Sequence, residues 1–145
     1  MKLLSRLFVV ASLGLLSACA SGPKLSEMQS SIPALKPSEG RIYFYRSSSM
    51  MGAAIQPAIT LNGAEVGSSK PGGFFYVDRA PGAMEVATAT EVEKKLTFTL
   101  AAGQTRYVRT RVGFGIVAGR VYPELVDNAE GEKEIADASY TGKPK

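Results

Sequence analysis

The chain has 145 residues, with no histidine and one cysteine. The absence of histidine excludes Ser-His-Asp and Cys-His nucleophilic groups as well as histidine-ligated zinc, and we predict no metal site. The formal net charge is +4 at neutral pH, but Lys2 and Arg6 lie in an N-terminal segment that we expect to be removed. The remaining chain is therefore close to neutral. We expect no nucleic-acid partner, because such a partner requires a concentrated basic surface.

Residues 1–18 have the three-part layout of a secretory signal. A short basic start is followed by an apolar segment from Leu7 to Leu16 and then by two small residues, Ser17 and Ala18. The apolar segment is too short for a permanent transmembrane helix. We therefore expect residues 1–18 to be cleaved and exclude them from the fold.

The only cysteine, Cys19, follows this segment directly. One cysteine in an exported protein cannot form an internal disulfide, so it is a free thiol, half of an intermolecular bridge or a site of modification. Its position favours modification, because Leu16-Ser17-Ala18-Cys19 resembles the lipobox of bacterial lipoproteins. The alternative is an ordinary secretory signal with an incidental cysteine.

The resemblance implies that the Cys19 thiol takes a diacylglycerol, that cleavage falls just before it, and that the new amino group is acylated. We expect no cofactor besides these covalent chains. Two or three acyl chains hold a protein lastingly on a membrane, whereas one chain gives only marginal binding. The next residue is Ala20, not the aspartate that retains such lipoproteins in the inner membrane. The resemblance therefore implies a lipid anchor on the periplasmic face of the outer membrane.

Residues 20–39 are rich in Ser and Pro and lack an apolar period, which predicts a flexible tether. A tether of this length has a root-mean-square span of about 25 Å, so the domain would stand clear of the lipid headgroups. We thus predict a lipidated cysteine and tether at 19–39, a folded domain at 40–140 and a short tail at 141–145.

The predicted domain contains about seven short strands. Asn62-Gly63 predicts a tight hairpin turn, because both residues tolerate a positive φ, and Pro123 predicts an edge strand or a bulge. A short C-terminal helix is expected around Glu132–Ala138, with Ile135 pointing inward. The strand-forming segments are 41–46, the hairpin within 57–67, 72–78, 83–90, 94–100, 105–112 and 121–126.

These segments are separated by turns and show no alternation with helices, which predicts an all-β fold, a single antiparallel β-sandwich. The stretches "GRIYFYR", "ITLNGAEVG" and "FFYVDRAPGAMEV" are similar to a family of bacterial proteins of unknown function, DUF2846, over roughly Gly40 to Ala138. Many members are lipoproteins, and the turn pattern also resembles PEGA-type β-sandwich domains. The shared motifs are turn residues and strand aromatics, so the resemblance implies a fold and supplies no catalytic residues.

Three arginines form a candidate contact surface: Arg109, Arg111 and Arg120. Arg109 and Arg111 share a strand face with Tyr107, because side chains alternate along a strand. One interpretation is contact with an anionic partner, such as a lipid headgroup or a glycan phosphate. The interpretation that we favour is a charged face that protects a sheet edge and pairs with Glu124.

Two apolar segments are further candidates. In the glycine-rich "VGFGIVAGRV" we expect Phe114, Ile116 and Val117 to pack into the core, since such glycines commonly mark bulges or bent connections. The alternative is an apolar loop that contacts a membrane or a partner. Met50 and Met51 either form an adaptable contact surface or cap one end of the sandwich.

The carboxylates lie in no recognisable motif and are expected on solvated faces. We therefore predict a non-catalytic binding or structural module of the bacterial envelope, held on the membrane by its lipid anchor, with an envelope protein or a glycan as partner. One alternative is an accessory subunit of an envelope complex, marked by an exposed apolar patch shared by the two apolar segments. Another is a glycan- or lipid-acting hydrolase, which would need a pocket holding two carboxylates or a lysine with a serine.

Overall fold

A computed structural model describes residues 19–142. The predicted signal, including Leu16, Ser17 and Ala18, lies outside the described residues. The helical elements are α2 (Leu25–Met28), the 3-10 helix η1 (Gln29–Ser31) and α3 (Asn128–Ile135). The strands are β1 (Gly40–Tyr45), β2 (Ala58–Leu61), β3 (Ala64–Ser68), β4 (Gly73–Arg79), β5 (Gly82–Ala89), β6 (Glu93–Leu100), β7 (Thr105–Gly113), β8 (Arg120–Val126) and β9 (Ser139–Tyr140).

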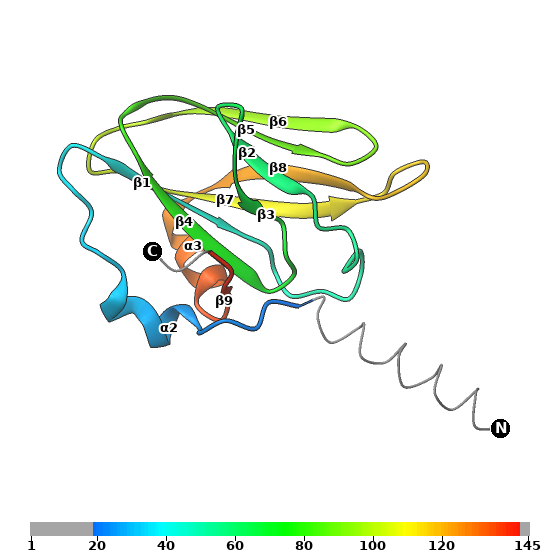
Figure 1. Cartoon of the computed structure of the whole chain (residues 1–145), viewed down its shortest axis with the longest axis horizontal. Coiled ribbons are helices and arrows are strands. Elements are labelled where there is room, and N and C mark those ends of the chain that lie inside the picture. The colour runs from blue at the N-terminus through cyan, green and yellow to red at the C-terminus, as the bar shows by residue number, and fades with distance from the viewer. Residues whose placement is uncertain (1–18, 143–145) are drawn as a thin grey trace.

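The strands form a five-stranded sheet, in the order β8-β7-β1-β4-β9, and a four-stranded sheet, in the order β3-β2-β5-β6. The two sheets pack face to face (Figure 1), which confirms the predicted all-β sandwich. Most strand pairs are antiparallel, but β1 pairs in parallel with β7 and β4 in parallel with β9. The chain adds β2 and β3 to the four-stranded sheet before β4 and adds β5 and β6 after it. It then returns beside β1 as β7, which runs in the same direction as β1.

The five-stranded sheet is apolar on both faces, as the run of aromatic and β-branched residues in β1 predicts. Ile42 and Phe44 point into the core between the sheets. Tyr43 and Tyr45 point to the opposite face, because successive side chains of a strand alternate. There they join a second apolar cluster that α3 and the N-terminal segment cover, so the molecule has a third layer (Figure 1).

Local turn and cap chemistry agrees with the predictions from sequence. Asn62 and Gly63 join β2 to β3 with φ values of 50° and 82°, as a primed hairpin turn requires. Pro123 lies in β8, an edge strand. The C-terminal helix begins about one turn earlier than predicted, because the Asp127 side chain caps it by accepting from the Glu130 N–H at 2.9 Å.

The segment at 20–39 differs from the predicted flexible tether, because it lies against the domain. The Ala20 N–H donates to the Pro71 carbonyl at 3.0 Å, and the Leu25 N–H donates to the Ala138 carbonyl at 3.2 Å. Leu25 and Met28 pack on the second apolar cluster. The aromatic face of the five-stranded sheet would otherwise be exposed to water, and covering it offsets the entropy lost by ordering the segment. Cys19 is consequently held beside the domain surface.

Candidate functional site

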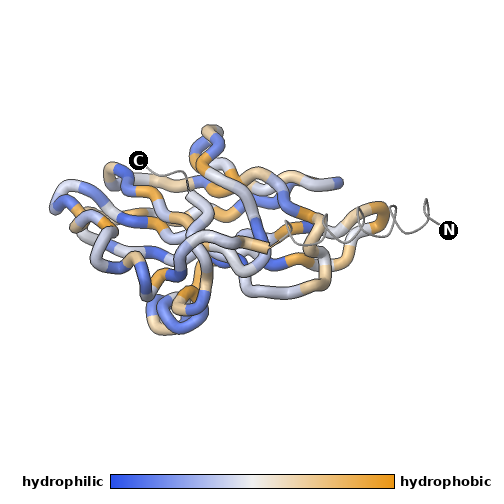
Figure 2. Tube along the Cα trace, turned by 60° about the horizontal axis from the view of Figure 1, so that its bottom comes forward, coloured by the Kyte–Doolittle hydropathy of each residue, from blue (hydrophilic) through white to orange (hydrophobic). Residues whose placement is uncertain are grey.

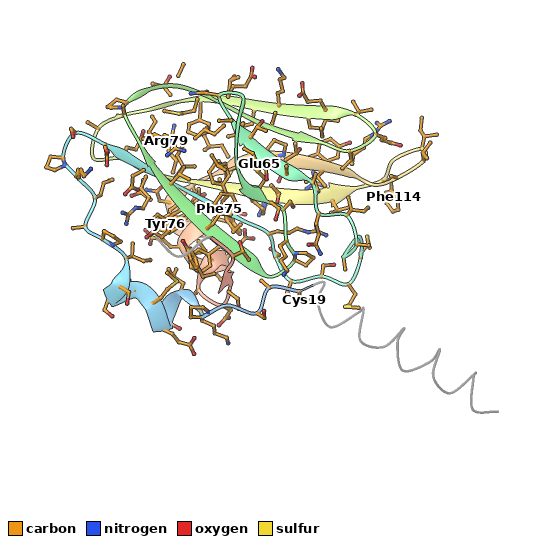
Figure 3. All side chains as sticks on the ribbon, in the orientation of Figure 1. Cys19, Glu65, Phe75, Tyr76, Arg79 and Phe114 are labelled. Atoms are coloured by element: carbon orange, nitrogen blue, oxygen red, sulfur yellow. The ribbon has the colours of Figure 1, made fainter. Side chains whose placement is uncertain are left out.

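The glycine-rich loop between β7 and β8 projects from one end of the sandwich. Its apolar side chains do not pack into the core, as we had expected: Phe114 is 92% exposed, Ile116 89% and Val117 91%. Figure 2 shows a hydrophobic tip at the right-hand end of the molecule, where Figure 3 labels Phe114. Contiguous exposed apolar side chains on a small domain are typical of a contact surface.

The loop is held in this exposed position by Glu91, which lies in the turn between β5 and β6. The Glu91 carboxylate accepts from the backbone N–H groups of Ile116 at 2.9 Å, Val117 at 2.8 Å and Ala118 at 3.1 Å. Arg120 Nε also donates to it at 2.8 Å. These donors, first of all the Val117 N–H, lower the pKa of Glu91 to about 2. The backbone of the loop tip is therefore organised around the Glu91 carboxylate, while its apolar side chains point outward.

The segment between β1 and β2 presents the second set of exposed apolar side chains, with Met50 75% and Met51 69% exposed. Arg46, which is itself buried, holds this segment. Its guanidinium donates to the carbonyls of Ile55 at 2.6 Å and Gly52 at 2.8 Å. Burial lowers the pKa of Arg46, and three carbonyls, including that of Ser69, accept from its two terminal nitrogens.

The structure brings these two segments together. They line one shallow hollow of about 280 Å³, to which Met51 and Ile55 contribute from the first segment and Phe114 and Val117 from the second. Neither segment collapses onto the core, so the two form one exposed surface. We call the five side chains Met50, Met51, Phe114, Ile116 and Val117 the apolar flank.

The arginines predicted as a contact surface are occupied by acidic neighbours. Arg111 donates to Glu124 at 2.7 Å and Arg109 does so at 3.2 Å, which is the cross-strand pairing that we favoured. Arg111, the larger cause, and Arg109 lower the pKa of Glu124. Arg120, the third candidate, is the partner of Glu91. The structure therefore separates Arg120 from the other two.

Arg109 also joins the sheet to α3, a role that the sequence did not indicate. Its Nη1 donates to Glu130 at 2.7 Å and to Glu134 at 3.0 Å. Glu134 in turn accepts from the Tyr45 hydroxyl; burial first, and this contact second, raise the pKa of Tyr45. The carboxylates that converge here neutralise one guanidinium, so they are held as ion pairs rather than directed into an open pocket.

A polar and aromatic hollow of about 520 Å³ lies between the N-terminal segment, the five-stranded sheet and α3. Tyr43 and Tyr107 stack at 5.2 Å on its floor, and burial, with a smaller effect of Glu132, raises the pKa of Tyr107 to about 12. The Arg41 guanidinium at its edge is bound to Asp78 at 2.7 Å. Of the residues that line this hollow, one is a carboxylate and none is a lysine.

Residues 19–142 were searched for membrane-spanning helices and for groups of metal ligands. No helix in this part of the chain is both long and apolar enough to cross a bilayer. Within the same range, no three His, Cys, Asp or Glu side chains are grouped so that they could hold a metal ion.

Comparison with known proteins identifies a family but no activity. The family model described as "Protein of unknown function (DUF2846)" matches residues 36–121, which is more than half of the chain. The chain belongs to this family. The matched range includes both segments of the apolar flank as well as Glu91 and Arg120, and it leaves out Cys19 and α3. No curated protein and no solved structure matches the chain.

Proposed function

We propose that this family member is a lipoprotein anchored through Cys19 to the outer membrane, on its periplasmic face, and that its β-sandwich is a non-catalytic binding or structural module. The observation that carries the proposal is the position of Cys19. It ends the lipobox-like Leu16-Ser17-Ala18-Cys19, and the ordered fold begins beside it, since Ala20 already bonds to the domain. Cys19 is partly exposed, so acyl chains on its thiol can extend away from the domain.

The non-catalytic part of the proposal is supported by the chemistry of the polar groups. The chain has no histidine, and the clustered carboxylates Glu124, Glu130 and Glu134 all accept from Arg109. A general acid or base needs a pKa shifted toward neutrality, whereas the pKa values of Glu91 and Glu124 are shifted away from it. The likeness to PEGA-type domains, which serves the same proposal, stays a prediction.

The test is metabolic labelling with a radioactive fatty acid in a bacterial host. The unaltered chain should incorporate label and sediment with the outer membrane, whereas Cys19→Ala should lose the label and retain the signal segment, because no thioether can form. Ser21→Ala, an exposed change two residues beyond, is the matched control and should label normally. Normal labelling of Cys19→Ala would refute the anchor.

The localisation has a separate test. Ala20→Asp places an aspartate directly after the cysteine, the arrangement expected to retain such lipoproteins in the inner membrane. Labelling should be unchanged while the protein moves to the inner-membrane fraction. If the unaltered chain is already found in the inner membrane, the outer-membrane part of the proposal fails and the anchor itself stands.

A second candidate, an accessory subunit of an envelope complex, is favoured by one observation. Met51 and Phe114 line one hollow, and Met50 and Ile116 are exposed on the same two segments, which supports this candidate. A photo-crosslinking amino acid at position 114 should then yield one discrete protein adduct in cells. The same probe at Ala102, an exposed turn residue between β6 and β7, is the control.

A further inference from the structure

We propose that the apolar flank docks on the bilayer that carries the Cys19 anchor, with Phe114, Ile116 and Val117 entering the acyl region and the two methionines lying at its edge. This inference rests on the proposed anchoring. It adds that the domain touches the membrane itself, in one orientation, instead of standing clear of it on a tether.

The residue after the proposed anchor is bonded directly to the domain. Ala20, the residue after the anchor, donates to Pro71 at 3.0 Å, and a methyl group placed on Gly73 would lie 3.1 Å from the Ala20 Cβ. The same turn continues to Gly72, whose own methyl position would be 3.5 Å from Ser48. Cys19 is thus tied to a turn that adjoins the segment bearing Met50 and Met51. Lipids on Cys19 would hold this part of the domain at the headgroups.

Cys19 and the two loops of the apolar flank lie toward one side of the domain. In Figure 1 the segment between β1 and β2 lies beside the start of the described chain, and the glycine-rich loop projects from the same right-hand half of the domain. Figure 3 places Cys19 and Phe114 toward this side and Arg79 toward the other end. Met51 and Phe114, one from each loop, also line one hollow. We infer that a bilayer fixed at Cys19 reaches both loops from this side.

Moving the glycine-rich loop into a membrane removes its backbone N–H groups from water. Exposed backbone N–H groups are expensive in an apolar phase unless they are bonded. In this loop the N–H groups of Ile116, Val117 and Ala118 are already satisfied by Glu91, whose charge Arg120 balances. The tip is also fixed before contact, so docking orders little that was free. The large apolar side chains gain from leaving water.

The position of the proposed anchor favours a bilayer over a protein as the occupant of the apolar flank. The anchor makes membrane contact intramolecular, so even a weak apolar surface on the same side is engaged at high effective concentration. A protein partner would have to enter between this flank and the headgroups. The position of Cys19 beside the flank therefore favours lipid as its occupant.

The experiment uses two features of the sequence, its single cysteine and its lack of tryptophan. The chain beginning at Cys19, which keeps every described contact, is coupled through that thiol to maleimide lipids in phosphatidylethanolamine–phosphatidylglycerol vesicles. Phe114→Trp introduces one indole on the apolar flank. Ala102→Trp is the matched control, in an exposed turn at the opposite end of β7.

We expect the indole of Phe114→Trp to emit at shorter wavelength on vesicles and to be quenched about two-fold or more by brominated acyl chains, as a side chain at the headgroup–acyl boundary is. Acrylamide in the water should quench it less than it quenches Ala102→Trp. Circular dichroism checks that both variants are folded. Equal acrylamide quenching of the two variants on vesicles would overturn the proposal, and the flank would then be free for a protein.

The test is independent of cellular lipidation, because the thiol is coupled chemically. A chain that docks on vesicles but takes no label in cells would refute the anchor alone. A chain that labels in cells while its flank stays in water would refute the docking alone.

Discussion

Two clusters of charged side chains hold different parts of this domain, and they have opposite effects on the apolar residues nearby. Arg109 gathers Glu124, Glu130 and Glu134, which clamps α3 over the aromatic face of the sheet. Glu91 gathers three backbone N–H groups and Arg120, which holds a loop with its apolar side chains in water. The same kind of interaction thus buries one apolar surface and exposes another.

The difference lies in what the central group binds. Arg109 binds side chains on a helix, and the helix brings its own apolar side, with Ile135, down on the sheet. Glu91 binds backbone, so it fixes the path of the loop and leaves the direction of the side chains outward. A loop organised in this way is expected to contribute little to stability and to serve contact instead.

The largest difference in unfolding free energy should come from replacing an isoleucine by alanine, once under α3 and once in the glycine-rich loop. Ile135→Ala removes a side chain that is 1% exposed and should lower the free energy of unfolding by about 3 kcal/mol. Ile116→Ala, at a position 89% exposed, should change it by less than about 0.5 kcal/mol. Urea unfolding followed by circular dichroism measures both. A comparable loss for the two variants would show that the loop is part of the core after all.

The next largest difference in stability should separate Arg109 from Arg111. Arg109→Ala would leave three gathered carboxylates without their shared cation. We expect a loss of about 2 kcal/mol, less than for a fully buried ion pair, because Arg109 is partly exposed. Arg111→Ala is the matched control, because this more exposed arginine pairs with one carboxylate of the described residues, that of Glu124. Its effect on the urea midpoint should be far smaller. Equal effects would mean that Arg109 does not organise α3.

The smallest effect is a pH dependence at Glu91. Its pKa falls from 4.5 in the unfolded chain to about 2 in the folded domain, so the unfolded chain binds the proton more readily. The contribution of Glu91 to stability is therefore complete above pH 4.5 and is lost as the pH falls toward 2. Comparing urea midpoints at about pH 5.5 and about pH 3, Glu91→Gln should lose less on acidification than the unaltered chain does.

Limited proteolysis of the same variant examines the loop itself. Cleavage between Gly113 and Gly119 should become faster in Glu91→Gln, since the backbone N–H groups lose a charged acceptor. Glu93→Gln, in the same hairpin but paired with Lys95, is the control. If both variants are cleaved at the rate of the unaltered chain, Glu91 does not hold the loop.

Local patterns were sufficient for much of the fold. Alternation located the strands, Asn62-Gly63 located the hairpin turn, and Pro123 marked an edge strand. The pairing of Arg109 and Arg111 with Glu124 was also predictable, because β7 and β8 are neighbours in the chain and side chains on one face of adjacent strands meet.

The remaining features depend on contacts between distant residues. The exposure of Phe114 is set by Glu91, which no local pattern links to the loop, so the glycines alone suggested a buried bend. The packing of Leu25 depends on an aromatic face that exists only once five strands have assembled. A Ser- and Pro-rich composition gave no sign of that face, and it therefore predicted a free tether.

The parallel pairing of β1 with β7 also has a kinetic consequence. Arg41 through Tyr45 lie beside Thr105 through Arg109, so the first strand keeps one unpaired edge until most of the chain is available. Long-range pairing of this kind slows folding. A chain delivered from its N-terminus cannot complete the five-stranded sheet before β7 arrives. An incompletely folded chain is the state in which a polypeptide can be threaded through a narrow channel.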